Sequence, residues 1–284
     1  MPSSQQEARL PLYRSHGRRL VRSWPTPRSP KIAGASKIRL GCMNENTTAL
    51  VTGANKGIGH ETARRLAELG MTVLVGARDP RRGEVAVDRL RKTSADVHLV
   101  HLDVADDASI ARVAGDVTKR FGRLDVLVNN AAIANGSAPP SKQSVAAMRE
   151  LFATNVFGLV AVTQAFLPLL ERAPAARIVN VSTSLGSSTL SANPDTPVSQ
   201  QNFLFAYSAS KSAVNAFTVR LANELRSKNV KVNSACPGYV ATDLNGHRGV
   251  RTVQEGAEII VRLATLPEDG PTAGFFNDAG AVPW

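Results

Sequence analysis

The sequence TTALVTGANKGIG occupies residues 47–59 and joins a short apolar run to a glycine-rich turn. The run Ala49-Leu50-Val51 is typical of a buried strand, and a helical segment follows the turn and ends at Gly70. Glycines at positions 53, 57 and 59 let the backbone turn sharply and approach a pyrophosphate, whose charge is favourable at a helix N-terminus. This placement favours a dinucleotide-binding turn over a merely structural one.

Short β-branched runs alternate with amphipathic helical segments along the rest of the chain. After residues 49–51, the runs lie at 73–75, 97–100, 126–128, 178–181, 230–232 and 275–276. Between them, sets such as Ile110, Val113, Val117 and Phe121 recur at helical spacing and would form core-facing stripes. The alternation predicts an α/β fold with one doubly wound domain and a mostly parallel, seven-stranded sheet.

Composition places the chain among ordinary globular proteins. It has 284 residues, of which 43% are hydrophobic and 20% charged, and it has no apolar run of 18 residues. The two cysteines are too few for a disulfide scaffold, and the five scattered histidines lack the spacing of a metal-ligand set. We therefore expect a cytoplasmic protein without a metal site and without a membrane partner.

The net charge of +11 is concentrated near the N-terminus. Residues 1–42 contain nine Lys or Arg and one acid, whereas the remainder carries 25 basic and 22 acidic residues. The tail is rich in Pro, Ser and Arg, so residues 1–43 are predicted to be a disordered extension before a catalytic domain at 44–284. A transit peptide, a nucleic-acid or membrane arm, and a misplaced start are alternatives. We favour a start near Met43 and no nucleic-acid partner.

Two basic residues indicate which dinucleotide would bind. The second strand ends at Arg78, where an NAD site usually has an acid, and Lys56 lies inside the glycine turn. Both would suit a 2′-phosphate and favour NADP(H), although both side chains could equally be solvated and Asp79 follows directly. Asp103, after the third strand, would accept from an adenine amino group or cap a helix.

Tyr207 and Lys211 are four residues apart in a helix-forming stretch, so their side chains share one helix face. A nearby ammonium favours the phenolate and would lower a tyrosine pKa that starts at about 10. The spacing alone is also consistent with a packed tyrosine and a solvated lysine.

The ordered set of motifs resembles the short-chain dehydrogenase/reductase superfamily. The set comprises the glycine turn, Asn129-Asn130-Ala131-Ala132, Asn155, Ser182-Thr183-Ser184 and the Tyr207/Lys211 pair, and the resemblance runs from Thr47 to Trp284. The glycine turn, the strand end at Arg78 and the stretch from Cys236 to Asp243 look most like the NADPH-dependent carbonyl reductases. The resemblance implies a Rossmann fold and an NADPH-dependent enzyme that reduces a carbonyl to an alcohol, or the reverse.

The resemblance also implies a role for each candidate catalytic residue. Tyr207 would exchange a proton with the substrate oxygen, and Lys211 would lower its pKa and hold the nicotinamide ribose. Asn155 would position a water that links Lys211 to solvent. Thr183 occupies the place of the family's substrate-binding serine, with Ser184 as the competitor.

The same resemblance predicts the cofactor-binding residues. They are Gly53, Asn55, Lys56, Gly57, Ile58, Gly59, Arg78, Asp103, Val104, Asn130, Tyr207, Lys211, Pro237, Gly238, Val240 and Thr242. Ala132 departs from the glycine that the family usually has there, and we expect its methyl group to be absorbed.

The sequence is consistent with more than one function, substrate and assembly state. A non-catalytic NADP-binding redox sensor is the alternative function, motivated by Thr183 and Ala132. Residues 186–205 look like an inserted loop, and this loop and residues 245–253 would determine which small carbonyl or alcohol binds. The chain could be a monomer or a homo-oligomer.

Overall fold

The structure, a computed structural model, describes residues 47–93 and 96–284. The basic extension predicted for residues 1–43 lies outside the described residues. The sheet has the order β3 (Val97–His101), β2 (Thr72–Ala77), β1 (Thr48–Thr52), β4 (Val126–Asn129), β5 (Ala176–Val181), β6 (Val230–Ala235), β7 (Phe275–Asn277) and β8 (Gly280–Ala281).

The sheet confirms the α/β prediction and corrects the number of strands. The seven predicted strands are all present and pair in parallel, and β8 adds an eighth that is antiparallel to β7. The eighth strand has only two residues, Gly280 and Ala281, so it carries no β-branched run that a pattern search would detect.

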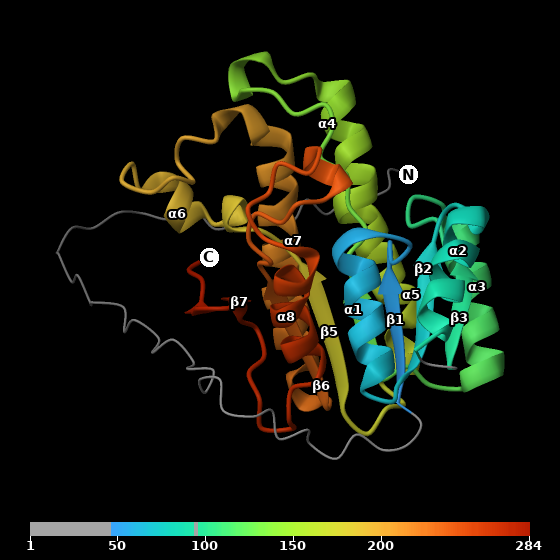
Figure 1. Ribbon diagram of the computed structural model, residues 1–284. Coiled ribbons are helices and arrows are strands. Elements are labelled where there is room, and N and C mark those ends of the chain that lie inside the picture. The colour runs from blue at the N-terminus through green and yellow to red at the C-terminus, as the bar shows by residue number, and fades with distance from the viewer. Residues whose placement is uncertain (1–46, 94–95) are drawn as a thin grey trace, which may run out of the picture.

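Alternate residues of each strand face two separate helical layers, as in a doubly wound sheet. In β1, Ala49 and Val51 pack with α1 (Gly57–Glu68), α2 (Pro80–Arg91) and α8 (Val253–Ala264). Leu50 faces the other layer, which contains α3 (Asp107–Phe121), α5 (Leu159–Leu170) and α7 (Phe205–Glu224). In Figure 1, α1 and α8 lie side by side on one face of the sheet.

The remaining elements gather beyond the carboxyl ends of the strands. They are η1 (Pro140–Lys142), α4 (Val145–Phe152), the π-helical turn η2 (Ala153–Gly158), η3 (Ser184–Gly186), α6 (Ser188–Ala192), η4 (Asn202–Leu204) and η6 (Asp243–Asn245). A further short turn, η5 (Leu225–Ser227), follows α7 at the opposite end. Strands β1 and β5 in Figure 1 point toward α4 and α6. The predicted loop 186–205 contains the short helix α6 and is thus partly helical. Ser187 caps this helix by accepting a hydrogen bond from the Leu190 N–H.

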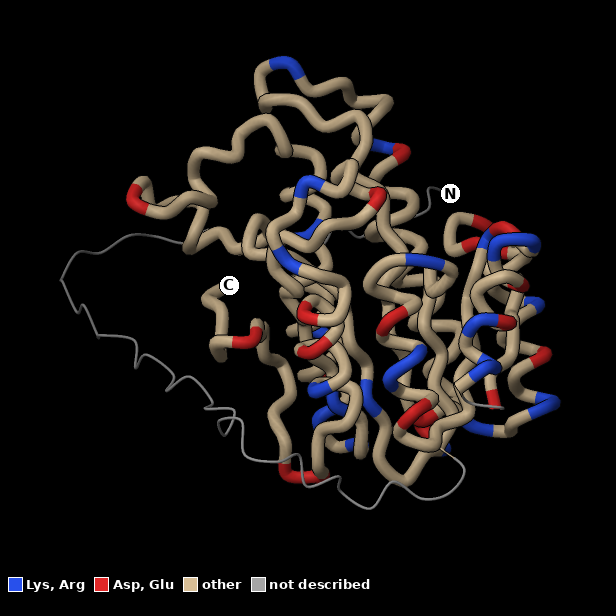
Figure 2. The backbone as a smooth tube through the Cα atoms, in the orientation of Figure 1, with Lys and Arg blue, Asp and Glu red and all other residues tan. Residues whose placement is uncertain are grey.

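The stretch Val145–Leu170 is long and apolar enough, by length and composition alone, to cross a membrane. Half of its most apolar window is buried inside the protein, as in a core helix of a soluble domain. Figure 2 shows Lys and Arg interspersed with Asp and Glu along the helices. This distribution agrees with the nearly balanced charge of residues 43–284.

Candidate active site

The glycine turn between β1 and α1 has a backbone that only glycine fits comfortably. Gly53 and Gly57 have positive φ angles of 63° and 58°. A Cβ at Gly59 would lie 2.4 Å from Asn130 Nδ2 and 2.7 Å from the Gly53 carbonyl oxygen. The N-cap of α1, Lys56, gives no side-chain hydrogen bond to the first turn, so the N–H groups there suit a pyrophosphate.

Asn130 and Thr52 fix the shape of this turn. Asn130 Nδ2 donates to the carbonyl oxygens of Thr52 (2.9 Å) and Gly53 (3.2 Å). Thr52 Oγ1 accepts from the N–H groups of Asn130 and Ala131, both at 3.0 Å. Asn130, a predicted cofactor-binding residue, therefore uses its amide N–H groups to hold the loop. Ala132 has no positive φ, so its backbone conformation does not strain the extra methyl group, as expected.

The structure defines the surroundings of Arg78, the basic residue at the end of β2. The Arg78 side chain is exposed, and His101 Nε2 bonds its carbonyl oxygen at 2.8 Å. His101 is itself held through its carbonyl oxygen by Arg112 of α3, at 3.2 Å. Asp79 caps α2 by accepting from the Arg82 N–H at 3.1 Å, so its carboxylate has a structural role.

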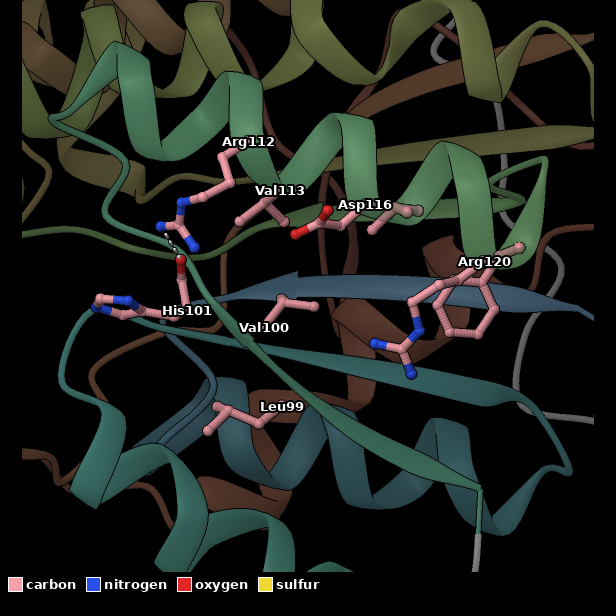
Figure 3. A pocket seen from close by; sticks show the side chains of 9 residues that line it. Leu99, Val100, His101, Arg112, Val113, Asp116 and Arg120 are labelled. Atoms are coloured by element: carbon pink, nitrogen blue, oxygen red, sulfur yellow. Dashed lines mark hydrogen bonds between the residues drawn. The ribbon is translucent and has the colours of Figure 1, made fainter.

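Arg112 and His101 also line a hollow of about 90 Å³ between β3 and α3 (Figure 3). Its other lining residues are Leu99, Val100, Val113, Asp116, Val117, Arg120 and Phe121. The hollow contains none of the residues predicted to bind cofactor or substrate.

Lys56 does not point freely into the cofactor site. Its ammonium forms an ion pair with Asp243, and both side chains are about half exposed. Asp243 also binds His247 Nε2 at 2.8 Å, and these partners hold the pKa of its carboxyl below its usual value. Any contact between Lys56 and a 2′-phosphate thus requires this exposed pair to open or to share the lysine, which leaves Arg78 as the more available cation.

Asp103 and Val104 lie in the turn after β3. Asp103 Oδ1 accepts from the Ala105 N–H at 3.0 Å, whereas the N-cap of α3 is Asp106. Asp103 therefore shapes a turn and is not the helix cap that the sequence suggested as an alternative. The carbonyl oxygen of Val104 lies where a side chain on Gly158 would clash, at 2.2 Å from a Cβ.

Asn155 is fully buried in the π-helical turn between α4 and α5. Its side chain accepts from the Ile133 N–H (2.9 Å) and donates to the Ile133 carbonyl oxygen (2.9 Å) and to Ser210 Oγ (3.1 Å). Both amide N–H groups are thus used by the protein. The side chain ties the loop after β4 to α7, next to Lys211.

Tyr207 and Lys211 share one face of α7, as predicted, but their pKa shifts differ from the expectation. Burial, with a smaller contribution from Cys236, raises the pKa of Tyr207 to about 12. Burial also lowers the pKa of Lys211 to about 8. The Lys211 ammonium lies 5.9 Å from the centre of the tyrosine ring and donates to the Val181 carbonyl oxygen at 2.7 Å. Desolvation of the phenolate therefore outweighs the attraction of the lysine in this state.

Thr183 and Ser184 stand at the end of β5, where η3 packs against α7. Thr183 Oγ1 caps η3 by accepting from the Leu185 N–H at 3.4 Å. The Gly186 carbonyl oxygen accepts from Ser212 and Asn215 of α7, and a Cβ at Gly186 would lie 2.8 Å from the Lys211 carbonyl carbon. This close packing sets the position of the hydroxyl pair relative to the tyrosine helix.

The segment 237–242 follows β6 and reaches the glycine turn. Gly238 has a φ of 79°, and Val240 is buried. A Cβ at Gly57 would lie 3.5 Å from Thr242 Cγ2, so the two segments are in contact distance. The residues predicted for the nicotinamide end and for the pyrophosphate end therefore lie close together at the carboxyl ends of the strands.

Three residues in this region were missed by the sequence reasoning. Ser210 accepts from Asn155 and donates to the Tyr207 carbonyl oxygen at 2.7 Å. Ser137 accepts from the Tyr207 N–H at 3.0 Å, and Cys236 accepts from the Ser184 N–H at 3.3 Å. The position of Ser210 next to Lys211 in the sequence is a signal that could have identified it. Ser137 lies 70 residues before Tyr207 and gives no local signal.

Comparison with known proteins identifies the class. The sequence model of the short chain dehydrogenase family matches residues 47–251. The chain is 34% identical to a (+)-neomenthol dehydrogenase of Capsicum annuum, over 82% of this chain and 98% of that protein. It is 33% identical to a carbonyl reductase [NADPH] 1 of Sus scrofa, over 85% and 96% of the two chains. The solved structure of salutaridine reductase from Papaver somniferum superposes with a TM-score of 0.71 at 31% identity, over 82% of this chain and 99% of that chain.

The chain belongs to the short-chain dehydrogenase family. It is therefore an oxidoreductase, the class of enzyme that the sequence resemblance implied. These relatives are named as reductases and dehydrogenases, so they do not favour the non-catalytic sensor.

Proposed function

We propose that the protein is an NADPH-dependent reductase of small carbonyl compounds. One observation carries the proposal: the buried Lys211 is held on the carboxyl end of β5 by Val181, on the helix face that also presents Tyr207. The relatives named as carbonyl reductase [NADPH] and salutaridine reductase support the reductive direction. A cytoplasmic location is part of the same proposal.

The residues of the proposed cofactor site suit a dinucleotide that carries a 2′-phosphate. The glycine turn would hold the pyrophosphate at the start of α1, where the N-cap leaves N–H groups free of side-chain bonds. Arg78 would hold the 2′-phosphate, with Lys56 as a second cation when Asp243 releases it. A bound reduced nicotinamide supplies the hydride.

Tyr207 would then donate its phenolic proton to the substrate oxygen. With a pKa of about 12, the side chain is protonated at neutral pH, which is the state that a proton donor requires. The resulting phenolate would be stabilised by the Lys211 ammonium on the same helix face. The Thr183 hydroxyl would orient the substrate oxygen by a further hydrogen bond.

The Lys211 ammonium has more hydrogen-bond donors than the Val181 carbonyl oxygen uses. An ammonium offers three N–H donors, and one is used by the Val181 carbonyl oxygen. The others would serve the nicotinamide ribose and a water that returns a proton to Tyr207. Asn155 would act here by fixing α7 through Ser210, because its own amide N–H groups are occupied.

The proposal is tested by cofactor preference. We expect oxidation of NADPH, with a panel of aldehydes, ketones and quinones, to be at least tenfold more efficient than oxidation of NADH. Arg78→Ala should lower kcat/KM for NADPH by about 10- to 100-fold and leave NADH nearly unchanged, because a charge-assisted contact to the phosphate is lost.

Arg226→Ala is the matched control. Arg226 is an exposed arginine in η5, after α7 and at the opposite end of the strands, and its guanidinium donates to Asn223 Oδ1. It should leave both cofactors unaffected. Equal use of NADH and NADPH by the unaltered chain would contradict the assigned preference.

A further inference from the structure

In the segment 237–242, Pro237 and Val240 are buried and the other four residues are partly or largely exposed. Val240 is packed in the interior, but Gly238 is exposed, and Tyr239 is 52% exposed. Gly238 also has a positive φ, which the flexible glycine can leave easily. Bonds from outside the segment therefore help to hold its exposed part in one conformation.

Arg251 supplies two of these bonds through its backbone. Its N–H donates to the Tyr239 carbonyl oxygen at 3.1 Å, and its carbonyl oxygen accepts from the Ala241 N–H at 2.8 Å. These two bonds make the isolated bridge between Arg251 and Val240. The segment is thereby paired with the residue that directly precedes the N-cap of α8.

The Arg251 side chain lies against the glycine. A Cβ built on Gly238 would be 2.9 Å from both Cδ and Nη1 of Arg251. The same guanidinium donates from Nη2 to the Glu255 carbonyl oxygen of α8 at 3.1 Å and pairs with Asp278. Arg251 thus joins the segment after β6 to the first turn of α8 and to the turn after β7.

Asp278 depends on this arginine. Its side chain is 30% exposed, and Oδ2 binds the guanidinium. The other oxygen, Oδ1, is buried and has no hydrogen-bond partner among the described residues. Removing the arginine would leave a poorly solvated carboxylate, so the turn and the segment would have to rearrange.

We propose that Arg251 is a positioning residue for the nicotinamide half of the cofactor. Its side chain packs against Gly238 and pairs with Asp278, and so holds the backbone of 237–242, which would form one wall of the nicotinamide site. The inference rests on the proposed function, because it assumes that this segment meets the nicotinamide. It predicts that Arg251 acts on one half of the dinucleotide and not on the other.

Two ligands separate the halves. NADPH carries both, whereas adenosine 2′,5′-bisphosphate carries the adenosine and its 2′-phosphate without the nicotinamide. We expect Arg251→Met to weaken NADPH about tenfold and to leave adenosine 2′,5′-bisphosphate within about twofold, both by isothermal titration. The rate of NADPH oxidation at saturation should fall as well, by about tenfold. Arg251→Lys, which restores a cation for Asp278, should recover part of both losses.

Arg262→Met is the matched control. Arg262 donates to the Asn277 carbonyl oxygen at 2.9 Å and so braces the same turn without touching the segment. It should lower the melting temperature and leave the affinity ratio of the two ligands unchanged. If Arg251→Met does not fold, Asp278→Asn provides the comparison, because it keeps the side-chain volume and removes the carboxylate.

The outcomes distinguish this inference from the function on which it rests. Equal weakening of both ligands, or no weakening of either, by Arg251→Met overturns the positioning role alone. An unaltered chain that binds adenosine 2′,5′-bisphosphate and not NADPH, or neither ligand, overturns the proposed function and the inference together. Selective loss of NADPH affinity supports both.

Discussion

The Lys211 ammonium is buried, and this burial lowers the free energy of unfolding. The side chain is 2% exposed, and burial lowers its pKa to about 8. An unfolded lysine titrates near 10.5, so below pH 8 both states are charged and the folded state bears the full desolvation cost. The hydrogen bond to Val181 offsets only part of that cost.

Lys211→Met should therefore stabilise the fold while abolishing turnover. We expect the free energy of unfolding at pH 7 to rise by about 1–2 kcal/mol, since the buried charge is removed and one hydrogen bond is lost. Denaturant titration and NADPH oxidation measure the two effects. A variant that is less stable than the unaltered chain would contradict the account of Lys211.

The stability difference should also depend on pH. Between about pH 8 and pH 10.5 the folded lysine loses its proton while the unfolded one keeps it, so the unaltered chain becomes relatively more stable as pH rises. The advantage of Lys211→Met should shrink across that window. Carbonyl reduction should fall as pH rises through about 8, because the ammonium that stabilises the phenolate is lost. A gap that stays constant from pH 7 to 10.5 would show that Lys211 is not the titrating group.

Elements place these side chains through close backbone contacts that tolerate no Cβ. Gly59 lies against Asn130 and Gly53, and a methyl group there would meet atoms at 2.4 Å and 2.7 Å. The start of α1 can therefore approach β4 and still leave its N-terminus open for an anion.

Gly59→Ala should displace the turn and weaken NADPH by at least tenfold, with a loss of stability of about 1–3 kcal/mol. Gly115→Ala is the control at an exposed position of α3, since a Cβ there meets nothing within 4 Å. It should leave NADPH affinity unchanged and stabilise α3 by about 0.5–1 kcal/mol. Equal effects of the two substitutions on affinity would contradict the close-approach argument.

The hydroxyl at the end of β5 can be assigned by a pair of substitutions. Thr183 caps η3 and Ser184 is the first residue of that turn, so the two side chains need not be equivalent. We expect Thr183→Val to lower kcat at least tenfold and Ser184→Ala to change it less than threefold. Thr183→Ser should keep most of the rate. If Thr183→Val retains turnover while Ser184→Ala loses it, Ser184 is the substrate-binding hydroxyl.

The elements that carry strong local patterns were predictable, and those made by distant contacts were not. The β-branched runs predicted the parallel strands, and the glycine turn predicted the start of α1. Strand β8 escaped detection because two small residues have no period, and α6 because its cap, Ser187, lies in a Ser-rich loop. The roles of Arg251 and Ser137 depend on partners far along the chain or on loop geometry, which a sequence pattern does not contain.

The site itself divides in the same way. Tyr207 and Lys211 lie on one helix face, as their spacing predicted, but the direction of the tyrosine pKa shift was wrong. Helix spacing gives proximity, whereas desolvation depends on all the elements that pack around α7. The pairing of Lys56 with Asp243, 187 residues away, was likewise outside what the glycine turn could reveal.

For the molecule as a whole, we propose that residues 44–284 form the working unit. The first strand begins at Thr48, and the sheet, both helical layers and the candidate site lie within the described residues. A chain that starts at Met43 should match the full chain in kcat/KM and unfolding free energy within experimental error. A clear loss of either would assign a role to the basic extension.

The measurement that tests the account most directly is a single turnover of a carbonyl substrate with enzyme-bound NADPH, in the unaltered chain and in Tyr207→Phe. The variant keeps the ring and lacks the phenolic proton, so we expect NADPH affinity to change less than threefold and the rate of NADPH oxidation to fall by about 10²- to 10⁴-fold. Equal rates in the two proteins would show that Tyr207 is not the proton donor.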